Sequence, residues 1–294
     1  MGLDLNDVSQ FFLKVNENVP LSDVILTKEQ EQSIHQFLRS AKNRTELRKY
    51  KIKATNTILL YGSAGGGKTF STKAIATELG MPLYVLNVAG VLEGANPLKN
   101  IQDVFDFVRD KKNQPCILFM DECDSIVMSR NRNDIEPQML RATNVVLQTI
   151  NEENEDLNSD LTIFSATNLV HKIDEAFKSR FGLQLEFPMP QDYGEQTKML
   201  MNGKKEFEYF NLIDDTDPND MRIINKRARE KEFSTRELKK KILEECEELA
   251  LKNIESGKPI QKLDIKLSNI MRRVARHIHS GISERLKSID KEDD

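Results

Sequence analysis

The sequence predicts an α/β fold, a parallel sheet with helices on both faces, followed by a small α-helical domain. From residue 57 onward, short apolar segments alternate with stretches of helical pattern, which is typical of a parallel sheet covered on both faces. After the proline-flanked segment PMPQD (188–192) no further strand pattern follows. We therefore expect a leader over residues 1–22, an α/β domain over 23–190 and a helical domain over 191–294.

The individual elements follow from local patterns. Thr27, with Gln30 three residues later, has the signature of a capping box and predicts a helix over 27–41. An apolar stripe at helical spacing predicts the clearest helix of the second domain over 235–253. The predicted strands are residues 57–61, 83–87, 116–120, 161–166 and 183–187.

Composition argues against several classes of protein. The sequence has no apolar run of the roughly eighteen residues that a transmembrane helix needs, and its start lacks the features of a secretory signal. The net charge of −4 does not favour a general nucleic-acid-binding protein. Cys116, Cys123 and Cys246 have no metal-ligand spacing, which predicts buried, reduced thiols. We expect a cytoplasmic protein without a membrane partner.

The glycine-rich segment GSAGGGKT (62–69) directly follows the first predicted strand. Its G-x-x-x-x-G-K-[ST] spacing is that of a loop whose backbone amides bind phosphate groups, with Lys68 at the terminal phosphates and the Thr69 hydroxyl on Mg²⁺. The helical pattern over 70–80 would point its N-terminus at the same site. The cofactor-binding residues predicted here are Gly62, Ser63, Ala64, Gly65, Gly66, Gly67, Lys68, Thr69 and Phe70.

A pair of acids follows the apolar strand CILFM (116–120). Asp121 and Glu122 would lie at the C-terminal end of that strand, where open α/β sheets bind ligands. Asp121 would hold Mg²⁺ beside Thr69, and Glu122 would accept a proton from the water that attacks the γ-phosphate. Acids at strand ends are common, but the position downstream of a phosphate loop favours the catalytic interpretation.

Two polar residues come later in the same domain. Asn168 ends the strand LTIFSATN (161–168) and is a candidate hydrogen-bond donor to the attacking water or the γ-phosphate, although alone it is as often a turn residue. Arg180, in DEAFKSRFG (174–182), directly precedes the last strand and is a candidate cation.

In this order, the segments resemble an AAA+ ATPase over roughly residues 20–250. SATN (165–168) followed by DEAFKSRF (174–181) is similar to the second region of homology of the AAA proteins, and DVIL (23–26), which includes Ile25, resembles their adenine-side entry segment. The corresponding motifs are the phosphate loop at 62–69, the acidic strand at 116–122, the sensor-one residue Asn168 and the arginine finger Arg180.

The resemblance implies ATP and Mg²⁺ as cofactors and a homo-oligomeric ring, usually of six subunits, in which Arg180 reaches the nucleotide of the neighbouring subunit. Arg236, in FSTRELKK (233–240), matches a sensor-two arginine at the start of the lid helix, or else is a solvated helix arginine. The pattern around it is similar to the pachytene-checkpoint proteins that remodel HORMA domains, and residues 23–80 resemble stand-alone bacterial AAA proteins.

The segment expected to line the central pore, VAGVLEGANPLKN (88–100), lacks an aromatic side chain. Leu92 or Val91 would grip a substrate more weakly there, with residues 93–96 as the loop tip. This departure from the family pattern argues against processive unfolding.

Three functions remain open from the sequence. The leading one is ATP-driven remodelling or disassembly of an unidentified partner protein. A DNA-associated loader or motor is the second, because residues 271–287 are basic, although their apolar spacing also fits a lid helix. The third is a nucleotide-dependent assembly switch with little turnover.

Overall fold

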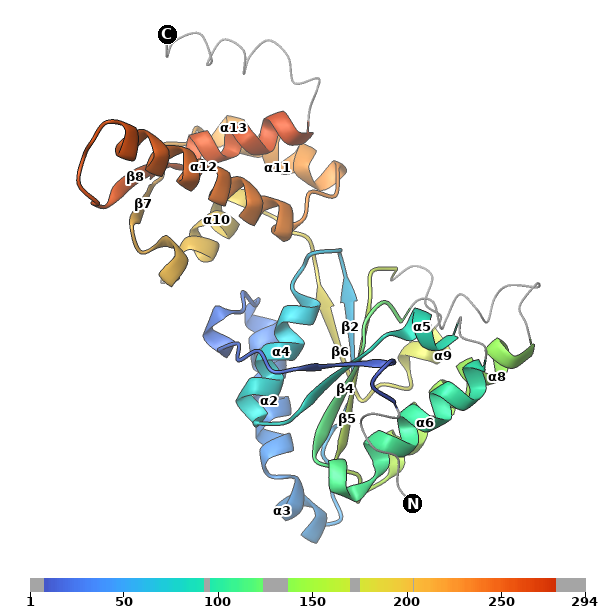
Figure 1. Cartoon of the computed structure of the whole chain (residues 1–294). Helices are drawn as coiled ribbons and strands as arrows, with labels where there is room; N and C mark the ends of the chain where they lie inside the picture. The colour runs from blue at the N-terminus through green and yellow to red at the C-terminus, as the bar shows by residue number, and fades with distance from the viewer. Residues whose placement is uncertain (1–7, 93–95, 124–136, 170–174, 203, 279–294) are drawn as a thin grey trace. The chain divides into compact units, whose positions relative to one another are not determined.

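The computed structural model describes residues 8–92, 96–123, 137–169, 175–202 and 204–278. Contacts divide the chain into two compact units, residues 1–62 with 67–187, and residues 63–66 with 188–294. The first unit holds a large sheet and the second is mainly helical (Figure 1). Among the helices of the described ranges, none combines the length and the apolar character that crossing a bilayer requires.

The first unit is built on a six-stranded sheet. Its strands are β1 (Phe12–Val15), β2 (Thr57–Gly62), β3 (Leu83–Leu86), β4 (Cys116–Met120), β5 (Leu161–Thr167) and β6 (Leu183–Phe187). Their order is β1-β3-β4-β5-β2-β6, and all neighbours are parallel except β1, which is antiparallel to β3. The five predicted strands and their parallel arrangement are confirmed. The predicted and observed strand ends differ by at most about one residue.

The first strand, β1, was not predicted. Its residues fall in the segment expected as a leader or short helix. Phe12 explains the difference, because its buried ring packs against Tyr84 of β3 and against Phe107, with ring centroids 5.7 and 5.6 Å apart. The segment therefore gains apolar burial by pairing at the sheet edge, a long-range contact that its own pattern does not reveal.

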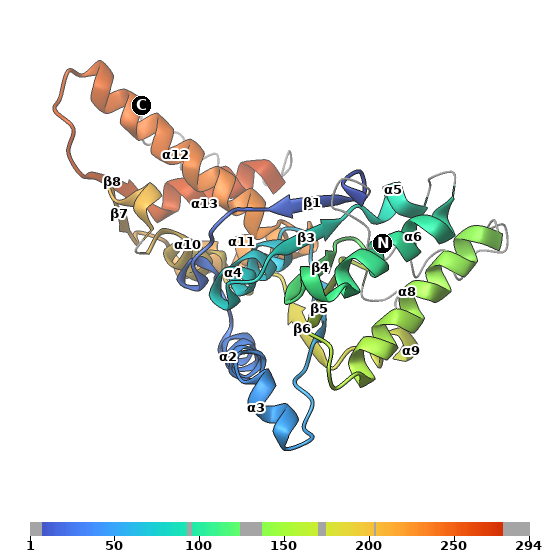
Figure 2. The same cartoon turned by 60° about the horizontal axis from the view of Figure 1, so that its bottom comes forward.

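Helices cover both faces of this sheet (Figures 1 and 2). They are α2 (Lys28–Lys42), α3 (Arg44–Lys49), α4 (Lys68–Leu79), α5 (Val88–Leu92), α6 (Pro97–Arg109), α8 (Pro137–Glu155) and α9 (Glu175–Lys178), with 3₁₀ turns η1 (Leu21–Asp23) and η2 (Lys111–Asn113). Side chains of β2 alternate between two cores, because successive strand residues point to opposite faces. Leu59 packs with α6 and α8, whereas Ile58 and Leu60 pack with α2 and α4.

The predicted capping box of α2 is present. The Thr27 hydroxyl accepts from the Gln30 backbone N–H at 3.2 Å, and the Gln30 side chain accepts from the Thr27 N–H at 2.8 Å. These two bonds satisfy N–H groups that a helix start leaves without intrahelical partners. The helix predicted over 27–41 is confirmed.

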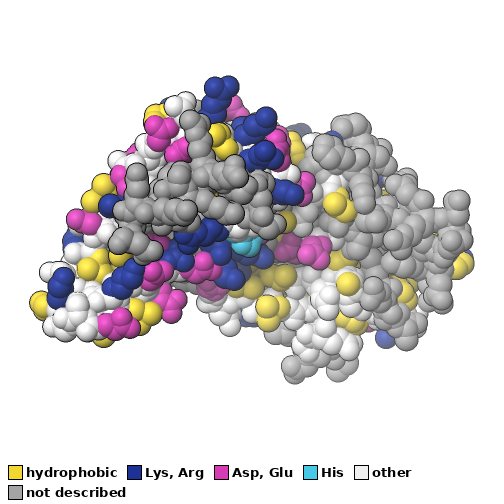
Figure 3. Space-filling model, turned by 90° about the horizontal axis from the view of Figure 1, so that it is seen from above, with side chains coloured by type: hydrophobic (Ala, Val, Ile, Leu, Met, Phe, Trp, Pro, Cys, Tyr) yellow, Lys and Arg dark blue, Asp and Glu magenta, His cyan; other side chains and the backbone are white. Residues whose placement is uncertain are grey.

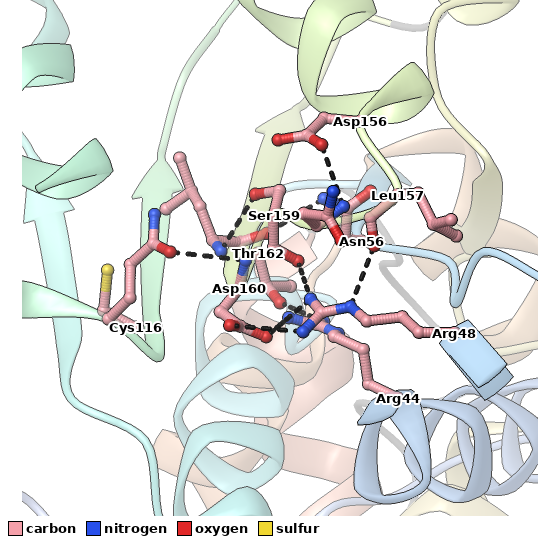
Figure 4. Close-up of polar contacts among 12 residues, drawn as sticks. Arg44, Arg48, Asn56, Cys116, Asp156, Leu157, Ser159, Asp160 and Thr162 are labelled. Atoms are coloured by element: carbon pink, nitrogen blue, oxygen red, sulfur yellow. Dashed lines mark hydrogen bonds and ion pairs between the residues drawn. The ribbon is translucent and has the colours of Figure 1, made fainter. Parts of the chain in front are cut away.

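A polar network lies at the N-terminal ends of β4 and β5 (Figure 4). Arg48 of α3 donates to the carbonyls of Leu157 and Ser159 at 2.8 and 2.7 Å and forms a 2.7 Å ion pair with Asp160. Arg44, one turn earlier, donates to the Thr162 hydroxyl at 2.9 Å, and burial lowers its pKa while Asp160 opposes that shift. The network joins α3 to the loop between α8 and β5.

The second unit packs its helices around a separate apolar core. Its elements are α10 (Tyr193–Met201), η4 (Lys205–Phe207), β7 (Phe210–Ile213), α11 (Pro218–Glu230), α12 (Thr235–Glu255), β8 (Leu263–Lys266) and α13 (Leu267–Ile278). The helix predicted over 235–253 is confirmed as α12, which starts with a capping box between Ser234 and Glu237. We refer to this mainly helical part, residues 188–294, as the lid.

The lid also contains two strands that the sequence did not predict. β7 and β8 pair in parallel, with Phe210 opposite Leu263 and Ile213 opposite Lys266. Each strand has four residues, too few to show a clear alternation of apolar and polar positions. The expectation of no strand beyond residue 192 is therefore wrong, although helices dominate the lid.

Candidate functional site

The candidate site lies at the C-terminal ends of three adjacent parallel strands, β4, β5 and β2. The glycine loop follows β2, the acid pair follows β4, and Asn168 follows β5. Because these ends meet at one edge of the sheet, segments far apart in the sequence come together there, at the edge where open α/β sheets bind ligands.

The glycines of the loop serve different purposes. Gly67, with φ of 102°, precedes α4, and a Cβ atom at this position would meet nothing within 4 Å. Gly67 has no side chain that could cap α4, and the first N–H groups of a helix lack intrahelical partners, which suits a phosphate group at this end. Gly62 is required for packing instead, because a Cβ atom there would lie 2.1 Å from the carbonyl oxygen of Phe187.

Lys68 is buried at the start of α4, with 6% of its surface exposed. Its Nζ donates to the carbonyl of Gly62 at 3.0 Å and to Oδ1 of Asn168 at 2.7 Å. The sequence placed these two side chains in separate motifs, and the structure brings them into direct contact. Both of these described acceptors are neutral, and a buried ammonium group at a helix start suits binding of an anion.

Thr69 and Asp121 are also in contact. The Thr69 hydroxyl donates to Oδ2 of Asp121 at 2.8 Å. A hydroxyl beside a carboxylate fits Mg²⁺, which prefers oxygen ligands and is usually held by one or two carboxylates together with substrate phosphates. Within the described residues no cluster of three or more His, Cys, Asp or Glu side chains forms a metal site by itself. The pair therefore suits an ion that arrives with a nucleotide.

Glu122 has an unusual backbone conformation. Its φ of 52° lies in the left-handed region, which glutamate rarely adopts and which costs free energy. The turn is held by two hydrogen bonds, from the Glu122 N–H to Asp121 Oδ1 at 3.0 Å and from the Cys123 N–H to the Ala166 carbonyl at 2.8 Å. Glu122 is exposed, whereas the strand residues Cys116–Met120 before it are buried.

Arg180, which follows α9, lies against helix α8 of the same chain. One guanidinium nitrogen donates to the carbonyl of Leu147 at 3.4 Å, and Nε is buried without a hydrogen-bond partner in the described part of the chain. The contacts that join Lys68, Thr69, Asp121 and Asn168 do not include Arg180.

Other predicted site residues have no described contact with this group. Phe70 is 40% exposed and Ile25 is half-buried before α2. Ser63 is half-buried and Ala64 is exposed. Arg236 is exposed in the first turn of α12, in the lid. Their roles toward a nucleotide stay predictions.

The structure corrects one expectation about the pore segment. Val91 is fully buried in the core of the first unit, within α5, and does not present its side chain to a substrate. Val88, one turn earlier on the same helix, is buried in the same core, so Val91 lies on the inward face of α5. The side chain of Leu92 and residues 93–95 lie outside the described part of the structure.

Two hydroxyl groups near the site were not foreseen. Ser71 donates to the carbonyl of Gly67 at 2.9 Å, and Thr72 donates to the carbonyl of Lys68 at 3.1 Å, both from buried positions. They fix the first turn of α4 from within the helix. Hydroxyl residues four positions after a glycine or lysine are too common for the sequence to signal this role.

The three cysteines are free and buried, as the sequence predicted. Burial raises the pKa of Cys116 and of Cys246 to about 12, so both thiols stay protonated at neutral pH. The thiols of Cys116 and Cys246 have no described contact with the candidate site.

Comparison with known proteins agrees with this arrangement. Residues 58–189 match the model of the ATPase family associated with various cellular activities (AAA). A putative 26S proteasome regulatory subunit homolog of Methanothermobacter thermautotrophicus is 26% identical over 67% of this chain and 50% of its own length. The ATP-dependent zinc metalloprotease FtsH of Lachnoclostridium phytofermentans is 27% identical over 65% of this chain and 34% of its own.

Solved structures show the same fold. The crystal structure of the FIGL-1 AAA domain in complex with ADP has a TM-score of 0.63 at 16% identity and covers 99% of this chain and 96% of its own. The match to the first of these curated relatives spans about half of that protein. AAA family ATPases are in general ATP hydrolases. Together, the motif geometry, the family match and the fold identify residues 58–189 as an AAA domain.

Proposed function

We propose that this chain is an ATP-hydrolysing AAA+ ring protein that remodels or disassembles a partner protein. The observation that carries the proposal is the meeting of Lys68, Thr69, Asp121 and Asn168 at one edge of the sheet, through hydrogen bonds of 2.7 and 2.8 Å. Phosphoryl transfer needs positioned cations and hydrogen-bond donors more than covalent chemistry, and these residues supply them.

Nucleotide binding would rest on the loop and on Lys68. The first-turn N–H groups of α4 and the ammonium of Lys68 bind the phosphates, and Lys68 exchanges one of its neutral acceptors for a phosphate oxygen. Thr69 and Asp121 would hold Mg²⁺, which offsets negative charge on the phosphates when bound.

Hydrolysis would rest on Glu122 and Asn168. Glu122 accepts the proton of the attacking water, because it is exposed and directly follows Asp121 at the end of β4. The Asn168 amide nitrogen donates to the water or to the γ-phosphate while its oxygen holds Lys68.

Assembly would complete the site. AAA+ proteins commonly form hexameric rings, and we propose that Arg180 leaves its contact with α8 and stabilises charge on the neighbour's γ-phosphate. The bond to the Leu147 carbonyl is long, 3.4 Å, and Nε has no hydrogen-bond partner among the described residues, so this release would cost little free energy. A cytoplasmic location, as the sequence suggests, is part of this proposal.

A protein partner is favoured over DNA by the contacts of the basic helix α13. Its Arg273 pairs with Glu245 at 2.5 Å and also with Glu248, so that part of its charge is neutralised within the lid. On the face of the molecule shown in Figure 3, acidic side chains lie among the basic ones. A salt-dependent DNA-binding assay distinguishes the two, since a DNA-associated motor loses affinity steeply as salt rises.

The test of the proposal mixes two variants that are each inactive alone. Arg180→Ala subunits keep Glu122, and Glu122→Gln subunits keep Arg180. If the finger acts in trans, hybrid interfaces that join the two intact groups recover ATPase activity. No recovery in verified mixed rings argues against the trans finger and against the ring mechanism.

A further inference from the structure

The segment that carries Arg180 is anchored by a pair of side chains that the nucleotide chemistry does not use. Thr57, the first residue of β2, is fully buried. Its hydroxyl accepts from the Gly182 backbone N–H at 3.0 Å and donates to Oδ1 of Asn154 at 3.1 Å. Asn154 belongs to the last turn of α8, and Gly182 directly precedes β6. Three elements therefore meet at one hydroxyl group.

The turn between α9 and β6 is short and fixed at both ends. At the α9 end of the turn, the Arg180 N–H donates to the Phe177 carbonyl at 3.1 Å. The buried rings of Phe177 and Phe181, on either side of Arg180 in the sequence, pack with centroids 5.3 Å apart. Downstream, the bond from Gly182 to Thr57 holds the chain two residues after Arg180. The backbone of Arg180 thus has little freedom of its own.

Gly182 shows how closely these groups approach. A Cβ atom at this position would lie 3.1 Å from Oδ1 of Asn154 and 3.2 Å from the Thr55 side chain. The regular pairing of β2 with β6 begins one residue later, at Ile58 opposite Leu183. The bond between the Gly182 N–H and the Thr57 hydroxyl therefore continues the pairing of β2 with β6 by one hydrogen bond, at the end nearer to Arg180.

We propose that Thr57 and Asn154 are positioning residues for the arginine finger, which set the direction in which Arg180 leaves the first unit. Helix α8 contacts Arg180 twice, directly at the Leu147 carbonyl and indirectly through Asn154 and Gly182. This inference rests on the proposed trans role of Arg180. A misplaced finger binds the neighbour's γ-phosphate poorly in the transition state but leaves ATP binding unchanged.

The principal variant is Thr57→Val, which keeps the branched shape of the buried side chain and removes the hydroxyl. Thr57→Ser is the matched control, because it retains the hydroxyl. Asn154→Ala removes the other side chain of the pair, on α8, and replaces Thr57→Val in the experiment if that variant does not fold. Melting curves of all three variants establish that the full chain is folded.

The experiment places each substitution on one side of the hybrid interface. In one mixture Thr57→Val is added to the Glu122→Gln subunit, which donates the finger, and in the other to the Arg180→Ala subunit, which hydrolyses. We expect about tenfold lower recovered ATPase when the donor carries the change and less than about twofold when the acceptor does, with KM for ATP within about twofold. Thr57→Ser in the donor should restore the rate.

The outcomes separate this inference from the function on which it rests. Equal losses in both arrangements, or a loss confined to the acceptor, would mean that Thr57 supports the phosphate loop through β2 and would overturn the positioning role alone. No recovery even without a Thr57 substitution overturns the trans finger and the positioning role together.

Discussion

The two edges of the parallel sheet carry similar polar side chains and use them in different ways. At the C-terminal edge, Lys68, Thr69, Asp121 and Asn168 form two short contacts, one between Lys68 and Asn168 and one between Thr69 and Asp121. Lys68 and Thr69 are the first two residues of α4. They lie next to the backbone N–H groups of its first turn, which Gly67 at the N-cap leaves without a side-chain cap. This edge is arranged to receive an anion.

At the N-terminal edge the polar groups bind one another (Figure 4). Arg48 contacts two backbone carbonyls and the Asp160 carboxylate, and its side chain is 20% exposed. Arg44 is more deeply buried, at 6%, and bonds Thr162. The guanidinium groups here tie α3 to the loop before β5, so their charges serve the fold.

This difference predicts whether a substitution changes the free energy of unfolding or the affinity for a ligand. Removing a group from the N-terminal edge leaves partners buried and unsatisfied, which lowers the free energy of unfolding. Removing a group from the C-terminal edge would take away the proposed interaction with the ligand, while the fold loses only the few hydrogen bonds of that side chain. Binding and stability should therefore separate between the two edges.

The largest effect is expected from Lys68→Ala. The loop then lacks its buried cation, and affinity for ATP should fall by at least about a hundredfold, because a hydrogen bond to a charged phosphate is lost in a buried site. Titration with a fluorescent ATP analogue measures this. Lys73→Ala, on the same helix but paired with Glu17 near the surface, is the matched control and should change affinity less than about twofold. A Lys68→Ala affinity within a few-fold of the parent chain would sink the phosphate-site assignment.

Much of the C-terminal edge could be predicted from the sequence because its signals are local. The glycine spacing before Lys68 and the acids after a run of apolar residues each occupy fewer than about ten consecutive positions, and parallel strands bring their ends together. The five parallel strands and the helix after the loop were likewise evident. What the sequence did not reveal was the direct contact between Lys68 and Asn168.

The N-terminal edge could not be predicted, because its contacts join residues far apart in the sequence. Arg48 and Asp160 are 112 positions apart, and Thr57 and Gly182 are 125 apart. Single arginines, threonines and glycines of this kind carry no motif. The same reason applies to β1 and to the burial of Val91, since both depend on which distant apolar side chains complete the core.

The next largest effect is expected on stability, from a substitution in the polar network at the N-terminal edge. Arg48→Ala removes the bonds to Leu157, Ser159 and Asp160, and we expect a loss of about 2 kcal/mol, below the full value for a buried pair because Asp160 is 34% exposed. For a unit of this size the melting temperature falls by about 5 °C. Circular dichroism of the full chain follows it. Lys49→Ala, whose side chain is 66% exposed, is the control and should shift melting by less than about 1 °C.

The smallest effect makes the comparison sharpest, because one chemical change is made at both edges. Asp160→Asn removes the charge that faces Arg48 and Arg44, and should cost about 1 kcal/mol, or a melting shift of about 3 °C. Asp121→Asn keeps an oxygen for the Thr69 hydroxyl or the Glu122 N–H, its partners in the structure, and should cost less than about 0.5 kcal/mol without nucleotide.

Nucleotide should reverse this ranking. When ATP and Mg²⁺ are added, the parent chain and Asp160→Asn should gain melting temperature by a similar amount, since a ligand at free concentration L that binds only the folded state stabilises it by RT ln(1 + L/Kd) and Kd is unchanged. Asp121→Asn gains less, because the carboxylate that would hold Mg²⁺ is neutral. Equal gains in both variants would show that Asp121 does not contribute to nucleotide binding, and the two edges of the sheet would then differ in stability alone.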